Sequence, residues 1–148
     1  MTHVHHSAVC TRDLDAALRF YRDGLGLQVL MDHEFDGAWR VLFDSRSDRL
    51  HSVFLGDPTH ADAGIVELVV FDGGVEPGAA PGPPATGFFL LSLFVDVDAT
   101  LARLAALDLG GEPRRIEVPA PHGPVAMATV RDPDGVLVEL IDAVAAAG

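Results

Sequence analysis

The side chains best suited to chemistry lie in two apolar stretches of the sequence. His5 and His6 lie in MTHVHHSAVC at the start of the chain, and Glu67 lies in GIVELVVF. Imidazole and carboxylate groups bind divalent metal ions and transfer protons. A carboxylate between Val66 and Leu68 is costly to bury unless it is paired or faces a solvent-filled cavity. The sequence therefore predicts functional roles for His6 and Glu67, while a structural role for each stays open.

Other polar side chains are weaker candidates for the same chemistry. His51 begins a strand and could act as a ligand or general base, and His122 in the PAPHG turn could line the mouth of a site. Cys10 shares the strand face of His6, but no sequence neighbour activates its thiol. Three arginines could bind an anionic substrate, although a solvated position is the commoner role for such residues: Arg40, Arg114 and Arg115.

Composition excludes several classes of function. The formal net charge is −12, and all ten basic residues are arginine. Such an acidic surface disfavours binding to nucleic acid or anionic lipid, and the absence of lysine excludes Schiff-base chemistry from this chain. No apolar run approaches the roughly 20 residues of a membrane span, and the N-terminus lacks a signal-peptide pattern. With a single cysteine and therefore no internal disulfide, we expect a cytoplasmic protein.

Alternation and turn residues predict the elements that position these side chains. In the first half, strands are expected at 4–10, 27–35, 49–56 and 64–71, with a helix that Asp13 or Asp15 caps and that Gly24 and Gly26 end. Segment 36–48 fits either a strand or a helix. In the first strand, alternation places His6 and Cys10 on one face and His5 on the other.

The second half repeats this order of elements. A strand at 88–95 is followed by a helix that Asp96 or Asp98 caps, and then by strands at 112–119, 123–132 and 135–143. DLDAAL matches DVDATL, and GIVELV matches GVLVELI. We therefore predict an α+β fold of two tandem βαβββ modules, residues 1–71 and 88–148, joined by a Pro/Gly-rich linker at 72–87.

The motifs HHSAVCTRDLDAALRFYRDGLGL, GIVELVVF and VRDPDGVLVELID together resemble the vicinal oxygen chelate superfamily. Its members include glyoxalase I, methylmalonyl-CoA epimerase, extradiol dioxygenases and bleomycin-binding proteins. The resemblance covers essentially the whole chain. It implies a fold in which the sheets of the two modules curl into a cup around one site.

The resemblance also implies a ligand set for a metal ion. In metal-using relatives, four strand residues face into the cup, and the matching positions here include His6, Glu67 and Glu139. The remaining position falls on Leu90 when counted from Val95, or on Phe89 when counted back from the helix, and neither side chain binds metal. One imidazole and two carboxylates suit Mn, Fe, Ni, Co or Zn, with Glu67 and Glu139 also as candidate catalytic residues.

Two functions remain open from the sequence. The first is a metal-dependent isomerase, lyase or dioxygenase acting on a small oxygenated substrate. The second is a metal-free protein that sequesters an antibiotic or another hydrophobic small molecule, as bleomycin-binding relatives do. A pocket for a flat aromatic ligand is predicted from five residues: Trp39, His51, Phe89, Leu90 and His122. Edge strands and apolar sheet faces further predict a homodimer.

Overall fold

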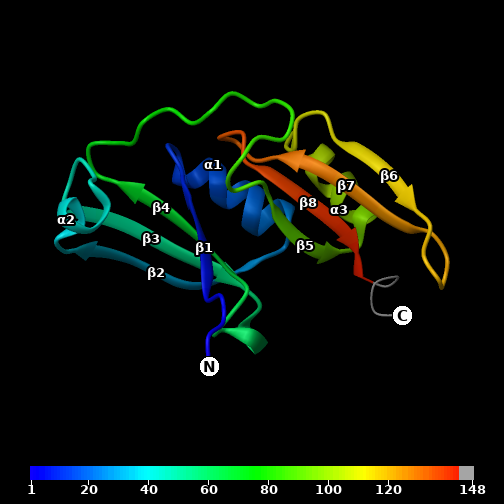
Figure 1. Ribbon diagram of the computed structural model, residues 1–148, viewed down its shortest axis with the longest axis horizontal. Helices are drawn as coiled ribbons and strands as arrows, with labels where there is room; N and C mark the ends of the chain where they lie inside the picture. Colours follow the sequence, from blue (N-terminus) through cyan, green and yellow to red (C-terminus); the bar gives the residue numbers. More distant parts are fainter. Residues whose placement is uncertain (144–148) are drawn as a thin grey trace. The chain divides into compact units, whose positions relative to one another are not determined.

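The computed structural model describes residues 1–143, so the last five residues of the predicted second module lie outside the described residues. The chain divides into two compact units, Met1–Pro77 and Gly78–Gly148. Each unit contains one four-stranded sheet (Figure 1). Residues 72–90, between the last strand of the first unit and the first strand of the second, contain no helix or strand.

The first unit has the strand order β1-β4-β3-β2. Strand β1 pairs in parallel with β4, and the other neighbours pair antiparallel. Its strands are β1 (His6–Cys10), β2 (Gln28–Asp36), β3 (Arg49–Gly56) and β4 (Ile65–Phe71). Its helical elements are α1 (Leu14–Leu18), which continues as a π-helix at Arg19–Gly24, then α2 (Trp39–Phe43) and a short 3-10 helix at Pro58–His60.

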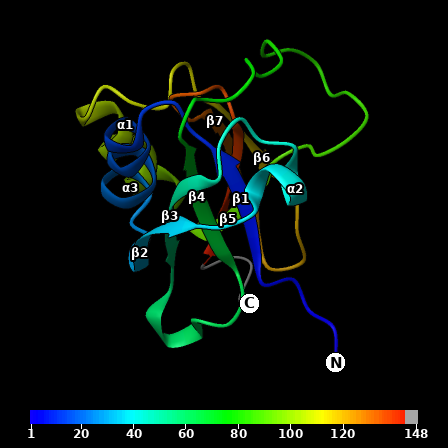
Figure 2. The ribbon, with the colours of Figure 1, turned by 90° about the vertical axis from the view of Figure 1, so that its left-hand side faces the viewer.

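Helix α1 forms because Asp13 caps it and because its apolar side chains cover the sheet. The Asp13 carboxylate accepts a hydrogen bond from the backbone N–H of Ala16 at 3.1 Å. Phe20 and Tyr21, in the π-helix, are fully buried, as is Leu55 of β3. Figure 2 shows α1 and α2 on opposite sides of the sheet. The hydrophobic core therefore lies on the α1 side, and the other sheet face is left for α2 and the site described below.

The segment at 36–48, which the sequence left open between strand and helix, contains the short helix α2 at Trp39–Phe43. The indole N–H of Trp39 donates to the carbonyl of Phe35 at 3.1 Å, which ties the helix to the end of β2. Asp44 has a left-handed backbone (φ 53°) and ends the helix. The apolar residues of α2 are therefore free to line the open sheet face.

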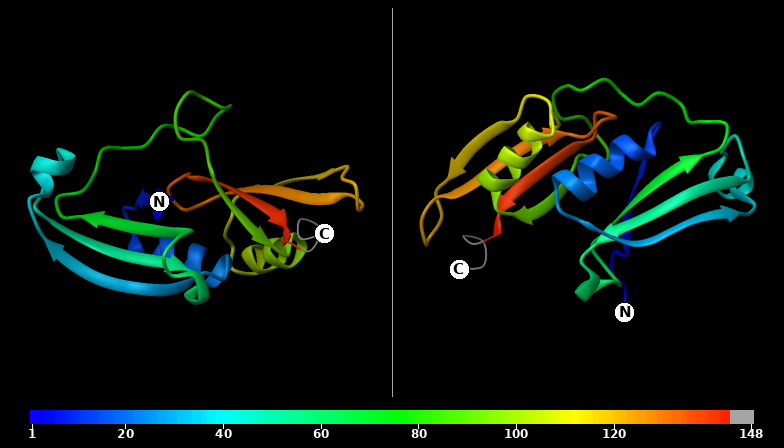
Figure 3. Two further views of the ribbon diagram at one scale, coloured as in Figure 1. Left: turned by 60° about the horizontal axis from the view of Figure 1, so that its bottom comes forward. Right: turned by 180° about the vertical axis from the view of Figure 1, so that it is seen from behind.

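The second unit repeats the arrangement with the strand order β5-β8-β7-β6. Its elements are β5 (Leu91–Val95), α3 (Val97–Ala106), β6 (Arg114–Val118), β7 (Val125–Arg131) and β8 (Leu137–Asp142) (Figure 3). The Asp96 carboxylate caps α3 through the N–H of Ala99 at 3.0 Å. The first strand begins at Leu91 rather than at residue 88, where the sequence predicted it.

These observations confirm the predicted α+β fold of two tandem βαβββ modules. The division between the units, at Pro77 and Gly78, falls inside the predicted linker at 72–87. Among residues 1–143, the helices do not include one with the length and hydropathy of a membrane-spanning segment.

Candidate active site

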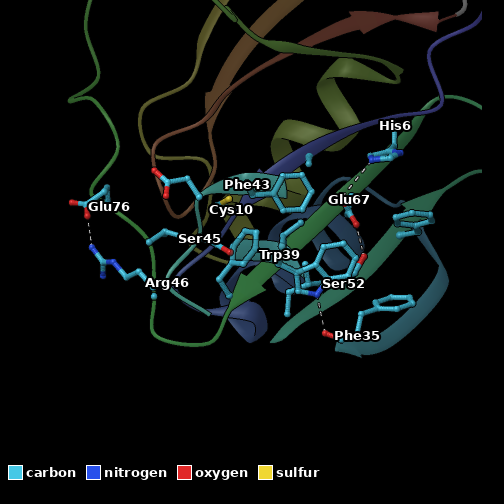
Figure 4. A pocket seen from close by; sticks show the side chains of 18 of the residues that line it. His6, Cys10, Phe35, Trp39, Phe43, Ser45, Arg46, Ser52, Glu67 and Glu76 are labelled. Atoms are coloured by element: carbon cyan, nitrogen blue, oxygen red, sulfur yellow. Dashed lines mark hydrogen bonds and ion pairs between the residues drawn. The ribbon is translucent and has the colours of Figure 1, made fainter. Parts of the chain in front are cut away.

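A pocket of about 860 Å³ occupies the face of the first sheet that α1 leaves uncovered. Alternate residues of the strands form its floor, while α2 and two loops form its walls (Figure 4). The floor consists of His6, Ala8 and Cys10 from β1, Glu67, Val69 and Phe71 from β4, Leu50, Ser52 and Phe54 from β3, and Met31 and Phe35 from β2. The predicted alternation of β1, with His6 and Cys10 on one face, is therefore present.

One end of this pocket is polar. His6 Nε2 lies 3.4 Å from Glu67 Oε1, and the Ser52 hydroxyl donates to Glu67 Oε2 at 2.5 Å. Ser52 is only 1% exposed, and the Glu67 side chain is 17% exposed. The Nδ1 atoms of His5 and His6 lie 2.8 Å apart, and the Phe54 ring packs on His6 with centroids 5.3 Å apart. The carboxylate is therefore held from two sides, which explains how the apolar β4 accommodates Glu67.

Aromatic side chains form the centre of the pocket. Trp39 and Phe43 of α2 stack at 5.8 Å with an interplanar angle of 14°, and Phe43 meets Phe71 edge-on at 6.1 Å. Trp39 lines this pocket, while its predicted role in binding a substrate stays a prediction. Such flat, rigid walls favour a flat apolar ligand.

The other end of the pocket carries an ion pair that the sequence analysis did not identify. Arg46 Nη2 donates to Glu76 Oε1 at 2.5 Å, and its Nη1 donates to the carbonyl of Gly73 at 3.3 Å. Both Arg46 and Glu76 line the pocket. No pattern in the sequence predicts this contact, because Arg46 and Glu76 are thirty positions apart and lie in two different loops. Ser52 was also missed, although its alternation with Leu50 and Phe54 places it on the pocket face.

Cys10 is a poor nucleophile at this site. Partial burial raises the pKa of its thiol above the ordinary value, and the nearby Glu67 carboxylate raises it further. The thiol therefore stays protonated at neutral pH. The sequence likewise offered no neighbouring residue that would activate it.

Glu139 lies on β8 in the second unit, where it accepts a hydrogen bond from the Ser92 hydroxyl at 2.8 Å. Glu67 pairs with Ala8 in the parallel ladder of its unit, and Glu139 pairs with Ser92 in the same ladder of the other. The two glutamates therefore hold equivalent positions. His6 lies two residues before Ala8, so its counterpart, two residues before Ser92, is Leu90 rather than Phe89.

The other candidate residues lie elsewhere. His51 is on the opposite face of β3 from Ser52 and Phe54, and its Nε2 contacts Asp32 Oδ1 at 2.5 Å. His122 lies in an exposed turn between β6 and β7, and Phe89 is 53% exposed before β5. Three arginines also lie outside the pocket of the first unit: Arg40, Arg114 and Arg115.

The three-residue ligand set stays a prediction. Within residues 1–143 no group of three or more His, Cys, Asp or Glu side chains is close enough together to hold a metal ion. His6 and Glu67 are brought together in the first unit, and Glu139 belongs to the second, which is described separately.

Comparisons with known proteins show which family the chain belongs to. The family model for the Glyoxalase/Bleomycin resistance protein/Dioxygenase superfamily matches residues 3–140. The chain is 39% identical over 145 residues to the lactoylglutathione lyase-like protein terB of Aspergillus terreus, covering 93% of this chain and 74% of that protein. It is 28% identical over 137 residues to a probable lactoylglutathione lyase of Synechocystis, covering 92% of each.

Solved structures show the same fold at lower identity. Glyoxalase I of Leishmania major superposes with a TM-score of 0.64 at 23% identity, covering 99% of this chain and 91% of that one. A glyoxalase family protein of Enterococcus faecalis gives a TM-score of 0.62 at 20% identity, covering 95% and 97%. With a family match across nearly the whole chain, the resemblance seen in the sequence is confirmed: this protein belongs to the Glyoxalase/Bleomycin resistance protein/Dioxygenase superfamily.

Proposed function

We propose that this protein is a metal-dependent lyase or isomerase that acts on a small, flat, oxygenated molecule bound in the pocket of the first unit. One observation carries the proposal: His6 and Glu67, with Ser52 bonded to the carboxylate, form one polar end of a pocket whose centre is aromatic. A polar pair at one end of an apolar pocket suits a substrate with its reacting oxygens at one end.

The donor chemistry of the chain fits a divalent metal. His6 and Glu67 would bind it from the first unit. Glu139, at the equivalent position of β8, stays a predicted ligand. The candidate ions are Mn, Fe, Ni, Co and Zn. When bound, such an ion acts as a Lewis acid that stabilises negative charge on a substrate oxygen.

The side chains of the pocket supply the remaining requirements. Ser52 orients the Glu67 carboxylate, so one oxygen faces a donor in the protein while the other lies on the His6 side. Glu67 is the residue placed to accept a proton from a bound substrate. Trp39 and Phe43 hold a flat substrate and exclude water from the carboxylate.

The relatives favour lyase or isomerase chemistry over oxygenation, because two of them are named as lactoylglutathione lyases or proteins like them. Glutathione itself is a poor match for this pocket. It carries two carboxylates and an ammonium group, whereas Arg46 is the only arginine in the lining. We therefore infer an aromatic or polyketide-like substrate.

A metal-free binding protein is the second candidate function. Leu90 occupies the position equivalent to His6, which removes one of the four donors that metal-using relatives place there. The large aromatic pocket would equally suit sequestration of a hydrophobic molecule.

Elemental analysis separates the two functions. The protein is purified without chelator or affinity metal, alongside His6→Ala and Glu67→Gln, with His60→Ala as the control because His60 lies outside the pocket in the exposed 3-10 helix. About one equivalent of metal per chain, retained in the control and lost in the two pocket variants, is expected. An absence of metal from all four proteins, with none taken up on dialysis against each ion, would refute the enzyme proposal and favour sequestration.

A further inference from the structure

The ion pair of Arg46 and Glu76 marks a specificity site that the proposed function does not use. Figure 4 shows these two side chains on one side of the pocket and His6 and Glu67 on the other, with Trp39 and Phe43 between them. The positions along β4 agree with this separation, because Glu67 lies near the start of the strand and Glu76 follows its end. From Glu67 to Phe71 the strand rises about 13 Å, at about 3.3 Å per residue.

Arg46 is placed to bind an anion that enters this pocket. It lines the wall next to the stacked rings, and its side chain remains 48% exposed. Glu76, its partner, is 83% exposed, so the pair is a solvated contact that contributes little to folding. A guanidinium binds a carboxylate through two parallel N–H donors. If the carboxylate belongs to a flat apolar molecule, burial of that molecule against the rings of Trp39 and Phe43 adds to the binding free energy.

We propose that Arg46 binds a carboxylate at the far end of an aromatic substrate, and that Glu76 occupies that position when no substrate is bound. The substrate class is therefore an aromatic acid, about two fused or linked rings long, with oxygens at the His6–Glu67 end and a carboxylate at the Arg46 end. Glu76 acts as an internal competitor that the ligand displaces. This inference rests on the proposed function, because it assumes that the pocket of the first unit is the substrate site.

Three acidic side chains line the pocket and act against this binding: Asp44, Glu67 and Glu76. Their repulsion makes binding of a carboxylate at this end of the pocket depend on Arg46, which is the only arginine in the lining. Discrimination between an acid and its neutral amide therefore reports on Arg46 directly. The same comparison tests Glu76, because replacing Glu76 removes the carboxylate that competes with the ligand for Arg46 and leaves the apolar walls of the pocket unchanged.

The test uses fluorescence of Trp39, which is the single tryptophan of the chain and lies in the pocket wall. The probes are a hydroxybiphenyl carboxylate, with hydroxyl and carboxylate at opposite ends, and the corresponding carboxamide. The proteins are the wild type, Arg46→Gln, Glu76→Gln and the control Arg22→Gln. Arg22 pairs with Asp23 at 2.9 Å with a similar exposure of 47%, but it lies outside the pocket.

We expect the wild type to bind the acid more tightly than the carboxamide. Arg46→Gln should weaken acid binding by about tenfold to a hundredfold and leave carboxamide binding unchanged. Glu76→Gln should tighten acid binding by about two- to fivefold, because an exposed competitor is removed. Arg22→Gln should match the wild type.

Two results would overturn the inference. The first contradicts only the role of Arg46, and the second contradicts the proposed substrate as well. If the wild type binds both probes but Arg46→Gln weakens them equally, Arg46 only shapes the wall, and the pocket remains the substrate site. If the wild type binds neither probe and Trp39 fluorescence does not respond, the pocket is not an aromatic site, and the proposed substrate falls with the inference. The metal content of Arg46→Gln should equal that of the wild type in either case.

Discussion

Replacing Ser52 by alanine should destabilise the protein, because it removes a hydrogen bond to the Glu67 carboxylate. It should also leave that carboxylate less well oriented in the pocket. Ser52 lies on β3 with 1% of its surface exposed, and its hydroxyl donates to Glu67 Oε2 at 2.5 Å. The change removes one oxygen atom and leaves the apolar packing of the strand intact. Its effect therefore reports on the support of the carboxylate rather than on a cavity in the core.

The expected magnitude follows from the charge and the burial of the acceptor. A hydrogen bond to a charged group contributes about 1.5 to 3 kcal/mol to stability. Glu67 is 17% exposed, so water can replace the hydroxyl in part, and the lower end of the range, about 1.5 kcal/mol, is expected. Ser92 provides the matched control, because it makes the same contact with Glu139 at 2.8 Å but is exposed. Ser92→Ala should change the free energy of unfolding by about 0.5 kcal/mol or less.

Urea unfolding of the wild type, Ser52→Ala, Glu67→Gln and the double variant measures the coupling between the two side chains. The coupling energy should be about 1 kcal/mol or more, since the residues are in direct contact. Metal affinity should also fall by about tenfold or more in Ser52→Ala, because the variant loses the group that orients a ligand. Additive effects of the two substitutions, together with unchanged metal affinity, would refute the role given to Ser52.

Further predictions concern the thiol and the core. In chelator-treated protein, Cys10 should be alkylated more slowly than a free thiol at pH 8, because partial burial and then the Glu67 carboxylate raise its pKa. Glu67→Gln should shift the dependence of the alkylation rate on pH to lower pH. An unchanged profile would contradict the assigned cause. Leu55→Ala, at a fully buried position, should cost about 2 to 5 kcal/mol in urea unfolding, against a negligible effect for the exposed Val41→Ala.

Local sequence patterns sufficed for most of the fold. Alternation in the first strand placed His6 and Cys10 on one face, because this signal acts over a few residues. The sequence also located both helix starts, although it left each cap open between two neighbouring aspartates, of which the structure selects Asp13 and Asp96. The pattern failed at 36–48, where the spacing of apolar residues fits both periods. There the structure depends on Trp39 reaching the carbonyl of Phe35 and on the left-handed Asp44, neither of which the spacing encodes.

The site was harder to predict because pairing between distant segments decides it. Counting along the chain could not choose between Phe89 and Leu90, whereas the ladder of β5 with β8 assigns Leu90. Arg46 and Glu76 meet because the antiparallel pairing of β3 and β4 brings the loop before β3 next to the loop after β4. Glu67 was recognised from its cost in an apolar strand, but the identity of its supporting partner, Ser52, depended on the register between β3 and β4.

The two modules differ most where the chemistry is proposed. Glu67 and Glu139 occupy equivalent positions, and each accepts a hydrogen bond from a serine, but the serines are not equivalent. In the first unit the donor comes from β3, and Ala8 fills the position that Ser92 holds in the second. Both modules therefore support an oriented carboxylate by different means, while only the first adds an imidazole and an aromatic pocket. The chemistry proposed for the first unit therefore depends on the pair of His6 and Glu67, at whose equivalent positions the second unit has Leu90 and Glu139.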